Sequence, residues 1–173
     1  MDAPGSILLV EDNDDDAFFF EKAVQRLGVS LKVERAADGA AAVEYLMKRI
    51  EASGEEAVTT PSLVMLDLKL PRMGGFEVLE WIRQHKGLSQ LWVSVLSSSG
   101  EEVDRLRASY LKADAFFVKP ISIEEYYVMV QRIWEEWLLP RFSAMEQKKT
   151  PLPEGPPSQE QSKENSSASA DQT

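Results

Sequence analysis

The sequence contains no cysteine and a single histidine, His85. Without cysteine there is no disulfide framework, no thiolate metal site and no thiol redox chemistry. One histidine does not supply the ligands of a zinc site, and we interpret His85 as a solvated residue at a helix end rather than as a phosphohistidine. A metal site in this chain would therefore be built from oxygen ligands.

Positive charge is also scarce: the sequence has 19 lysine and arginine residues and 29 aspartate and glutamate residues, so its net charge is −10. No basic patch stands out along the chain. Binding of nucleic acid depends chiefly on Lys and Arg, so we expect no nucleic acid partner. The apolar runs are far shorter than the ~18 residues of a spanning helix, and no basic stretch leads into an apolar segment at the N-terminus. We expect a soluble, cytoplasmic protein with no membrane partner.

The length of 173 residues and the hydrophobic content of 43% suit one well-buried domain. Beyond residue 142 the hydrophobic periodicity is lost, and the chain becomes rich in Pro, Ser, Gln and Glu. Such a segment buries too little apolar area to offset the entropy lost on ordering. We predict one domain at residues 1–142 and a disordered C-terminal tail at residues 143–173, with a tether or docking segment as the alternative for the tail.

Apolar segments and amphipathic segments alternate along the domain. Strict alternation of strand and helix predicts an α/β fold, a doubly wound five-stranded parallel sheet with helices on both faces. Asp38 is expected to cap the second helix, and the last helix is expected to end at Pro140, because proline breaks a helix interior. The predicted strands are residues 6–10, 31–36, 63–66, 91–96 and 115–118, and the last helix is predicted at residues 121–139.

Asp67 follows the apolar run 63–66 and precedes a loop that contains Pro71 and the pair Gly74-Gly75. This places one carboxylate at the C-terminal end of a buried strand, where open α/β sheets carry their functional sites. The alternative, that Asp67 only caps the next helix, is weakened because the glycine pair already provides that turn.

Four predicted strand ends each deliver polar groups to the same edge of the sheet. Carboxylates packed together repel one another unless a cation lies between them, and a set of oxygen ligands with room for waters and a phosphate favours Mg²⁺. A carboxylate nucleophile, a lysine and a hydroxyl, without a general base, suit phosphoryl transfer onto Asp67. The groups expected to converge are Glu11-Asp12, Asp67, Ser97 and Lys119.

Over about residues 5–140 the chain resembles the receiver domain of the response regulators of two-component signalling. The resemblance implies a flavodoxin-like fold of five βα units. It also implies a single-domain regulator that accepts a phosphoryl group on Asp67 from a sensor histidine kinase or a phosphotransfer protein. Such a regulator signals to a downstream protein. It catalyses only its own phosphorylation and dephosphorylation. The matching motifs are Val10-Glu11-Asp12-Asn13, Leu66-Asp67-Leu68-Lys69-Leu70-Pro71 with Gly74-Gly75, Ser97-Ser98 and Val118-Lys119-Pro120.

The same resemblance implies roles for the metal ligands. Asp12 and Asp67 would bind Mg²⁺ together with the backbone carbonyl of Lys69. Glu11 stands where the family often has Asp, so its direct ligation is in doubt and it would act through a water.

A second set of roles follows for the residues that respond to phosphorylation. Lys119 and Ser97 would bind the phosphoryl oxygens, and Phe116 would turn inward as Ser97 moves. The resemblance implies a cis bond between Lys119 and Pro120, and a trans turn is the alternative.

Two departures from minimal receivers resemble stand-alone regulators that partner phytochrome-type photoreceptor kinases: the long connector at residues 52–61 and the end of the last helix, at residues 132–140. That helix is apolar over more than one stripe, which together with the fourth helix and fifth strand predicts a homodimer surface.

Phe18, Phe19 and Phe20 cannot all face one core, so at least one is expected to lie outside it. That residue would form part of a kinase-docking surface, and partial burial under the neighbouring loop is the alternative. Asp14, Asp15 and Asp16 are interpreted as helix N-terminal charges rather than extra ligands.

Three other functions fit this sequence less well. A Mg²⁺-dependent aspartyl phosphatase generally needs a second Asp two residues after the nucleophile, where this chain has Lys69. A receiver-like binding module that works without phosphorylation usually lacks part of the acidic pair or the lysine, and both are present here. A dinucleotide-binding sheet is disfavoured because no glycine-rich turn follows the first strand.

Overall fold

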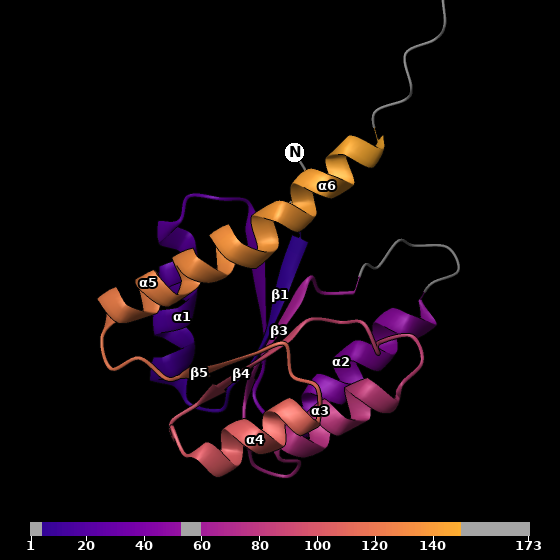
Figure 1. The fold of residues 1–173 in the computed structure, drawn as a ribbon, viewed down its shortest axis with the longest axis vertical. Coiled ribbons are helices and arrows are strands. Elements are labelled where there is room, and N and C mark those ends of the chain that lie inside the picture. The colour runs from indigo at the N-terminus through magenta and orange to yellow at the C-terminus, as the bar shows by residue number, and fades with distance from the viewer. Residues whose placement is uncertain (1–4, 53–59, 150–173) are drawn as a thin grey trace, which may run out of the picture.

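A computed structural model describes residues 5–52 and 60–149. The chain forms a parallel sheet with strand order β2-β1-β3-β4-β5, and a helix follows each strand (Figure 1). This confirms the predicted doubly wound α/β fold. The strands are β1 (Gly5–Val10), β2 (Leu31–Ala36), β3 (Leu63–Asp67), β4 (Val93–Ser97) and β5 (Ala115–Val118).

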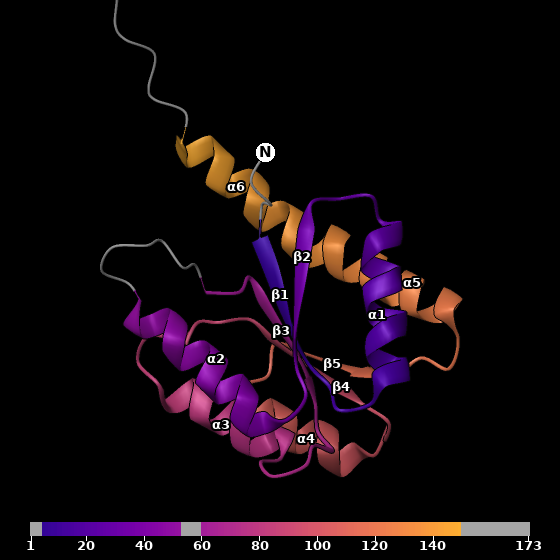
Figure 2. The same ribbon diagram turned by 180° about the vertical axis from the view of Figure 1, so that it is seen from behind.

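Helices cover both faces of the sheet, with α1 and α5 on one face and α2, α3 and α4 on the other (Figures 1 and 2). Successive side chains of a strand point to opposite faces. Ile7 and Leu9 therefore join the core beneath α1 and α5, whereas Leu8 and Val10 join the core beneath α2 and α3. These helices are α1 (Asp14–Arg26), α2 (Gly39–Glu51), α3 (Gly75–Gln84), α4 (Glu102–Tyr110) and α5 (Ile123–Ile133).

The register of the strands brings their C-terminal ends to one edge of the sheet. Asp67 is paired with Leu96 in β4, and Ser97 is paired with Val118 in β5. Every residue of β3 and β4 is buried, as the continuous apolar runs predict for central parallel strands. The residues that follow β1 and β5 therefore emerge beside Asp67.

Three local predictions concern the environments of Asp38, Phe18 and His85. Asp38 is the N-cap of α2, and its carboxylate accepts a hydrogen bond from the Ala41 N–H at 2.8 Å, as predicted. Phe18 is 54% exposed, which confirms that the three phenylalanines do not share one core. His85 lies at the C-terminal end of α3, as predicted, but it is half-buried with its ring 5.3 Å from that of Trp81 instead of solvated.

The prediction that the last helix ends at Pro140 is wrong. After α5 the chain makes a π-helical turn at Trp134–Leu138 and continues as α6 (Leu139–Lys149) (Figure 1). The domain boundary predicted at residue 142 therefore falls inside a helix, and residues 143–149 are helical rather than disordered. The rest of the predicted tail lies outside the described residues.

Two features explain how the helix passes the proline. The Leu139 N–H bonds to the carbonyl of Trp134, five residues earlier, and this wider turn comes just before the position where the proline ring would crowd the preceding turn. The Trp134 ring packs 5.9 Å from that of Phe142, across the turn, and Leu138 is buried. Burial of apolar surface on both sides of Pro140 offsets the hydrogen bond that proline cannot donate.

No peptide bond of the described residues is cis. The cis bond implied between Lys119 and Pro120 is therefore wrong, and the trans alternative holds. Within residues 5–52 and 60–149, no helix is long and apolar enough to cross a membrane.

The start of α3 packs directly on the end of β3, and this contact depends on Gly75. A Cβ at this position would collide with the backbone carbonyl of Asp67, whereas a Cβ at Gly74 would lie 3.4 Å from a flexible Glu77 carboxylate oxygen. We predict that Gly75→Ala lowers the free energy of unfolding by about 2–3 kcal/mol. Gly74→Ala, as the control, should cost less than about 1 kcal/mol. Urea denaturation measures both, and equal losses would contradict the close approach.

Candidate functional site

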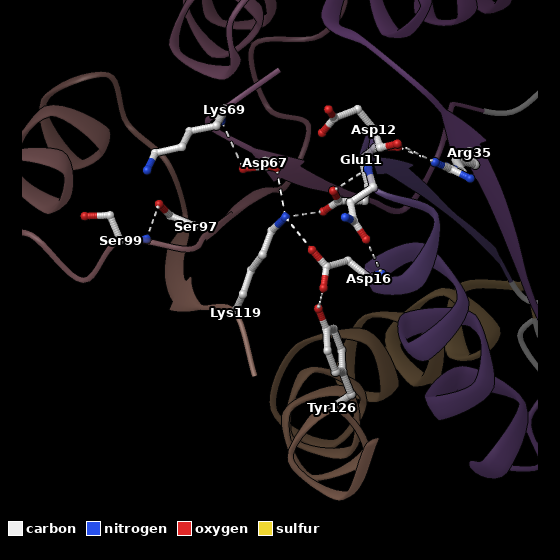
Figure 3. A network of polar contacts seen from close by, with 11 residues as sticks. Glu11, Asp12, Asp16, Arg35, Asp67, Lys69, Ser97, Ser99, Lys119 and Tyr126 are labelled. Carbon is white, nitrogen blue, oxygen red and sulfur yellow. Dashed lines mark hydrogen bonds and ion pairs between the residues drawn. The ribbon is translucent and has the colours of Figure 1, made fainter. Parts of the chain in front are cut away.

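The ammonium group of Lys119 lies at the centre of the C-terminal edge of the sheet (Figure 3). Its Nζ is 2.7 Å from Glu11 Oε2, 2.9 Å from Asp67 Oδ2 and 2.9 Å from Asp16 Oδ2. The side chain of Lys119 is only 10% exposed, and Glu11 and Asp67 are nearly fully buried. These ion pairs are therefore shielded from solvent far more than surface pairs are.

Backbone hydrogen bonds hold these groups at the strand ends. Glu11 follows β1, and its Oε1 accepts from the Asn13 N–H at 3.0 Å. Asp67 ends β3, and its Oδ1 accepts from the Lys69 N–H at 3.0 Å. The Lys119 N–H donates to the carbonyl of Ser97 at 2.8 Å, which joins the ends of β4 and β5. Each predicted residue is thus fixed by the strand end that carries it.

Ser97 and Phe116 lie beside this cluster on the neighbouring strands. Ser97 is fully buried, and its hydroxyl accepts a hydrogen bond from the Ser99 N–H at 3.1 Å. Phe116 is half-buried against the core formed by Leu68, Val95 and Ala108. Ser97 thus ends β4, whereas Phe116 is the second residue of β5 and pairs with Val95, and the switch roles of both residues stay predictions.

The carboxylates provide oxygen ligands for a cation. One oxygen each from Glu11, Asp12 and Asp67 lies within 4.8 Å of the other two. Glu11 and Asp67 are buried and Asp12 is exposed, so the group combines fixed ligands with access to solvent. A hard divalent cation that keeps some of its waters fits this donor set.

The pKa values of Glu11 and Lys119 are both raised, for different physical reasons. Burial raises the pKa of Glu11 above its ordinary value and the charge of Asp67 acts in the same direction, although Lys119 and the Asn13 N–H oppose it. Burial would lower the pKa of Lys119, but its hydrogen bonds to Glu11, Asp67 and Asp16 together raise it. Lys119 therefore stays positively charged at neutral pH.

Sequence reasoning missed three residues of this site. Asp16 lies in the first turn of α1, as predicted, but it also pairs with Lys119. Tyr126 donates its hydroxyl to Asp16 Oδ1 at 3.1 Å. The third is Arg35 in β2, which donates to the carbonyls of Glu11 at 2.9 Å and Asp12 at 3.0 Å (Figure 3). Lys32 and Glu34 alternate with apolar residues in β2, and Arg35 breaks this alternation, which was the only sequence signal for it.

The arrangement combines a buried carboxylate, a fixed ammonium group and a nearby hydroxyl. The site has more carboxylates than ammonium groups, which leaves excess negative charge for a metal ion to balance. The carboxylates are those of Glu11, Asp12, Asp16 and Asp67, and the ammonium group is that of Lys119. His85, the single histidine, lies at the end of α3 that is remote from the strand ends, so it provides no general base here. The groups present suit transfer of an anionic group onto the Asp67 carboxylate.

Comparison with known proteins gives the same family at several levels. The response regulator receiver domain matches residues 7–131. The probable methanogenesis regulatory protein FilR2 of Methanothrix harundinacea is 38% identical over 135 residues, which cover 78% of this chain and 84% of that protein. The response regulator Rcp1 of Synechocystis sp. is 32% identical over 135 residues, which cover 78% of this chain and 90% of that protein.

Solved structures agree with the sequence comparison. The phosphorylated cyanobacterial phytochrome response regulator RcpA has a TM-score of 0.69 at 32% identity, over 78% of this chain and 94% of that one. The Mn²⁺-bound form of Rcp1 has a TM-score of 0.68 at 31% identity, over 78% and 95% of the two chains. The domain match spans every strand end of the site, and the chain therefore belongs to the receiver domain family of the response regulators.

Proposed function

We propose that Asp67 is the residue that accepts the phosphoryl group, from a phosphohistidine on a sensor histidine kinase or a phosphotransfer protein. A carboxylate oxygen of Asp67 forms the new bond to phosphorus, while the phosphorus–nitrogen bond breaks and the imidazole leaves with its electron pair. The observation that carries this proposal is the buried contact between Asp67 Oδ2 and Lys119 Nζ at 2.9 Å. The chemistry of this chain would end at its own phosphorylation and dephosphorylation.

Lys119 is placed to stabilise the charge that develops on the transferred group. In phosphoryl transfer most of the catalysis comes from positioning and from electrostatic stabilisation of the equatorial oxygens. The ammonium group is charged, desolvated and held at the acceptor carboxylate before a phosphodonor arrives. Little reorganisation is then needed during the reaction.

We propose Mg²⁺ as the ion that this site takes. Asp12, Asp67 and the backbone carbonyl of Lys69 would hold it, and Glu11 would act through a water. Bound there, the ion would supply positive charge for the incoming phosphoryl oxygens. The cluster of carboxylate oxygens within 4.8 Å supports this assignment, as does the Mn²⁺-bound form of Rcp1.

The response to phosphorylation is proposed to run through Ser97 and Phe116. Ser97 and Lys119 would bind the new phosphoryl oxygens, and Phe116 would turn from its half-buried position, where Arg105 lies 4.6 Å from the ring centre, into the space that Ser97 leaves. To shift the ratio of the outward and inward conformations from 1:99 to 99:1, phosphorylation must stabilise the inward conformation by ~5.5 kcal/mol relative to the outward one. Two charge-assisted hydrogen bonds of ~1.5–3 kcal/mol each approach that amount.

The partners follow from the relatives and from the exposed surface. Phytochrome response regulators are among the similar structures, which supports a cytoplasmic phytochrome-type kinase as the phosphodonor. Val103, Leu106 and Tyr110 leave α4 with an exposed apolar face. Exposed apolar patches of this kind mark protein contacts, so we propose that this face, with β5 and α5, binds a second copy of the chain or a downstream protein.

The first prediction of the proposed function concerns the acceptor residue. Incubation with acetyl phosphate and Mg²⁺ should add one phosphoryl group to the wild type, measured by intact mass, and none to Asp67→Asn. Asp15→Asn, which changes an exposed acid nearby, should react like the wild type, and removal of Mg²⁺ with a chelator should block the reaction. No addition to the wild type, or equal addition to Asp67→Asn, would sink the proposal.

The second prediction separates acceptance of the group from the response to it. Ser97→Ala should still be phosphorylated, but it loses one hydrogen bond of as much as ~3 kcal/mol, which lowers the inward population of Phe116 from ~99% to ~40%. NMR signals of the Phe116 ring before and after phosphorylation measure this. Ser98→Ala, at the exposed neighbour, is the control. A full response in Ser97→Ala would exclude the proposed switch.

The third prediction concerns self-association. Leu106→Glu should abolish a phosphorylation-dependent dimer, because a buried unpaired charge opposes association. Size-exclusion chromatography of both phosphorylation states measures the dimer, and Phe18→Glu, an exposed apolar residue on α1, should leave it intact. Loss of the dimer in Phe18→Glu alone would place the interface on α1 instead.

A further inference from the structure

Asp16 joins Lys119 to helix α5 through its two oxygens (Figure 3). Its Oδ2 lies 2.9 Å from Lys119 Nζ, and its Oδ1 accepts a hydrogen bond of 3.1 Å from the hydroxyl of Tyr126. Tyr126 is fully buried, whereas the side chain of Asp16 is 28% exposed. The chain of contacts therefore runs from the core side of α5 to the acceptor Asp67.

We propose that Tyr126 and Asp16 are positioning residues for the phosphorylation of Asp67. The Tyr126 hydroxyl fixes the carboxylate of Asp16, and that carboxylate aims the Lys119 ammonium at the place where the phosphoryl group forms. This inference rests on the proposed function, because it assigns Lys119 to the phosphoryl oxygens.

The backbone holds both partners in place. Asp16 lies in the first turn of α1, where its own N–H donates to the N-cap residue Asn13 at 2.9 Å. Tyr126 lies in the first turn of α5, whose N-cap Ser122 accepts from the Glu125 N–H at 3.2 Å. Such caps stabilise the first turn of each helix, from which the two side chains extend. The Tyr126–Asp16 contact therefore has a fixed geometry that it can pass to Lys119.

A phenylalanine ring would fill the same space as the ring of Tyr126, so the hydroxyl is not needed for packing. The ring fills a buried space beside Phe19, with ring centres 6.0 Å apart, and a buried hydroxyl costs free energy unless it is hydrogen-bonded. Burial raises the pKa of Tyr126, and the charge of Asp16 raises it further. The hydroxyl stays protonated at neutral pH and so remains a donor to Asp16.

The three N–H donors of Lys119 explain why Asp16 matters to the reaction. In the structure the ammonium group donates hydrogen bonds to Asp16 and Asp67, and its nitrogen forms an ion pair with Glu11 at 2.7 Å. Once Asp67 carries the phosphoryl group, its own negative charge is used in the new bond, and the third donor can turn to a phosphoryl oxygen. Asp16 and Glu11 still hold the nitrogen, so the donor turns without the side chain moving away.

The decisive variant is Tyr126→Phe, which removes one hydroxyl and changes no charge. We expect its rate of phosphorylation by acetyl phosphate, measured by intact mass, to fall about three- to tenfold. Tyr127→Phe makes the same change at the next residue of α5 and should react at the wild-type rate. In a double variant with Asp16→Asn, Tyr126→Phe should cause no further loss, since two residues that act as a unit are not additive.

A second measurement does not depend on phosphorylation. In ¹H–¹⁵N spectra of lysine side chains, the Lys119 ammonium protons should exchange with water slowly in the wild type and in Tyr127→Phe, and faster in Tyr126→Phe. A wild-type rate of phosphorylation in Tyr126→Phe overturns the inference, and a faster rate would show that Asp16 competes for Lys119 instead of aiming it. If the wild type accepts no phosphoryl group, the proposed function fails, and unchanged exchange in Tyr126→Phe then overturns the positioning role as well.

Discussion

The shared ammonium group of Lys119 is the interaction on which the rest of the site depends. Carboxylates from the end of β1, the end of β3 and the first turn of α1 meet at one nitrogen, and without it they would repel one another in a buried setting. The lysine therefore lets the fold keep an acceptor carboxylate buried and accessible to chemistry at once. Lysine suits this position better than arginine does, because its flexible four-carbon side chain ends in three donors that can rotate, whereas the guanidinium of arginine is planar and rigid.

The parallel sheet makes this convergence possible. A single register connects Val10 to Leu66, Asp67 to Leu96 and Ser97 to Val118, so the loops that leave these strands begin side by side. Arg35 adds a second constraint from the edge strand, because its guanidinium holds the backbone of the β1–α1 loop and pairs with Asp14 at 2.8 Å. The loop that carries the acidic pair is thus tied to the sheet on both sides.

The residues at strand ends could be predicted from the sequence because topology decides their position. Asp67, Ser97 and Lys119 follow apolar runs, and parallel strands bring such residues together whatever the details of packing. The three consecutive acids of α1 could not be sorted in this way. Each turns by about 100° from the last, and only the packed structure shows that Asp14 meets Arg35, Asp15 faces solvent and Asp16 faces Lys119.

The continuation of the helix past Pro140 was unpredictable for a related reason. A local rule stops a helix at proline, but packing between turns overrides it here. Trp137 lies between Trp92 and Phe117, with ring centres 5.6 and 5.5 Å away. These partners lie 45 and 20 positions back along the chain, beyond the reach of any short pattern.

The course of α6 has a practical consequence. Phe142 lies against Gly5, at the start of β1, so α6 leaves the fold at the edge of the sheet where the strands begin (Figure 1). Asp67 ends β3 and therefore lies at the opposite edge. A dye, an affinity handle or a surface linker attached near Lys149 is carried at the edge where the strands begin. A protein immobilised through α6 would therefore present its acceptor carboxylate to partners in the surrounding solution.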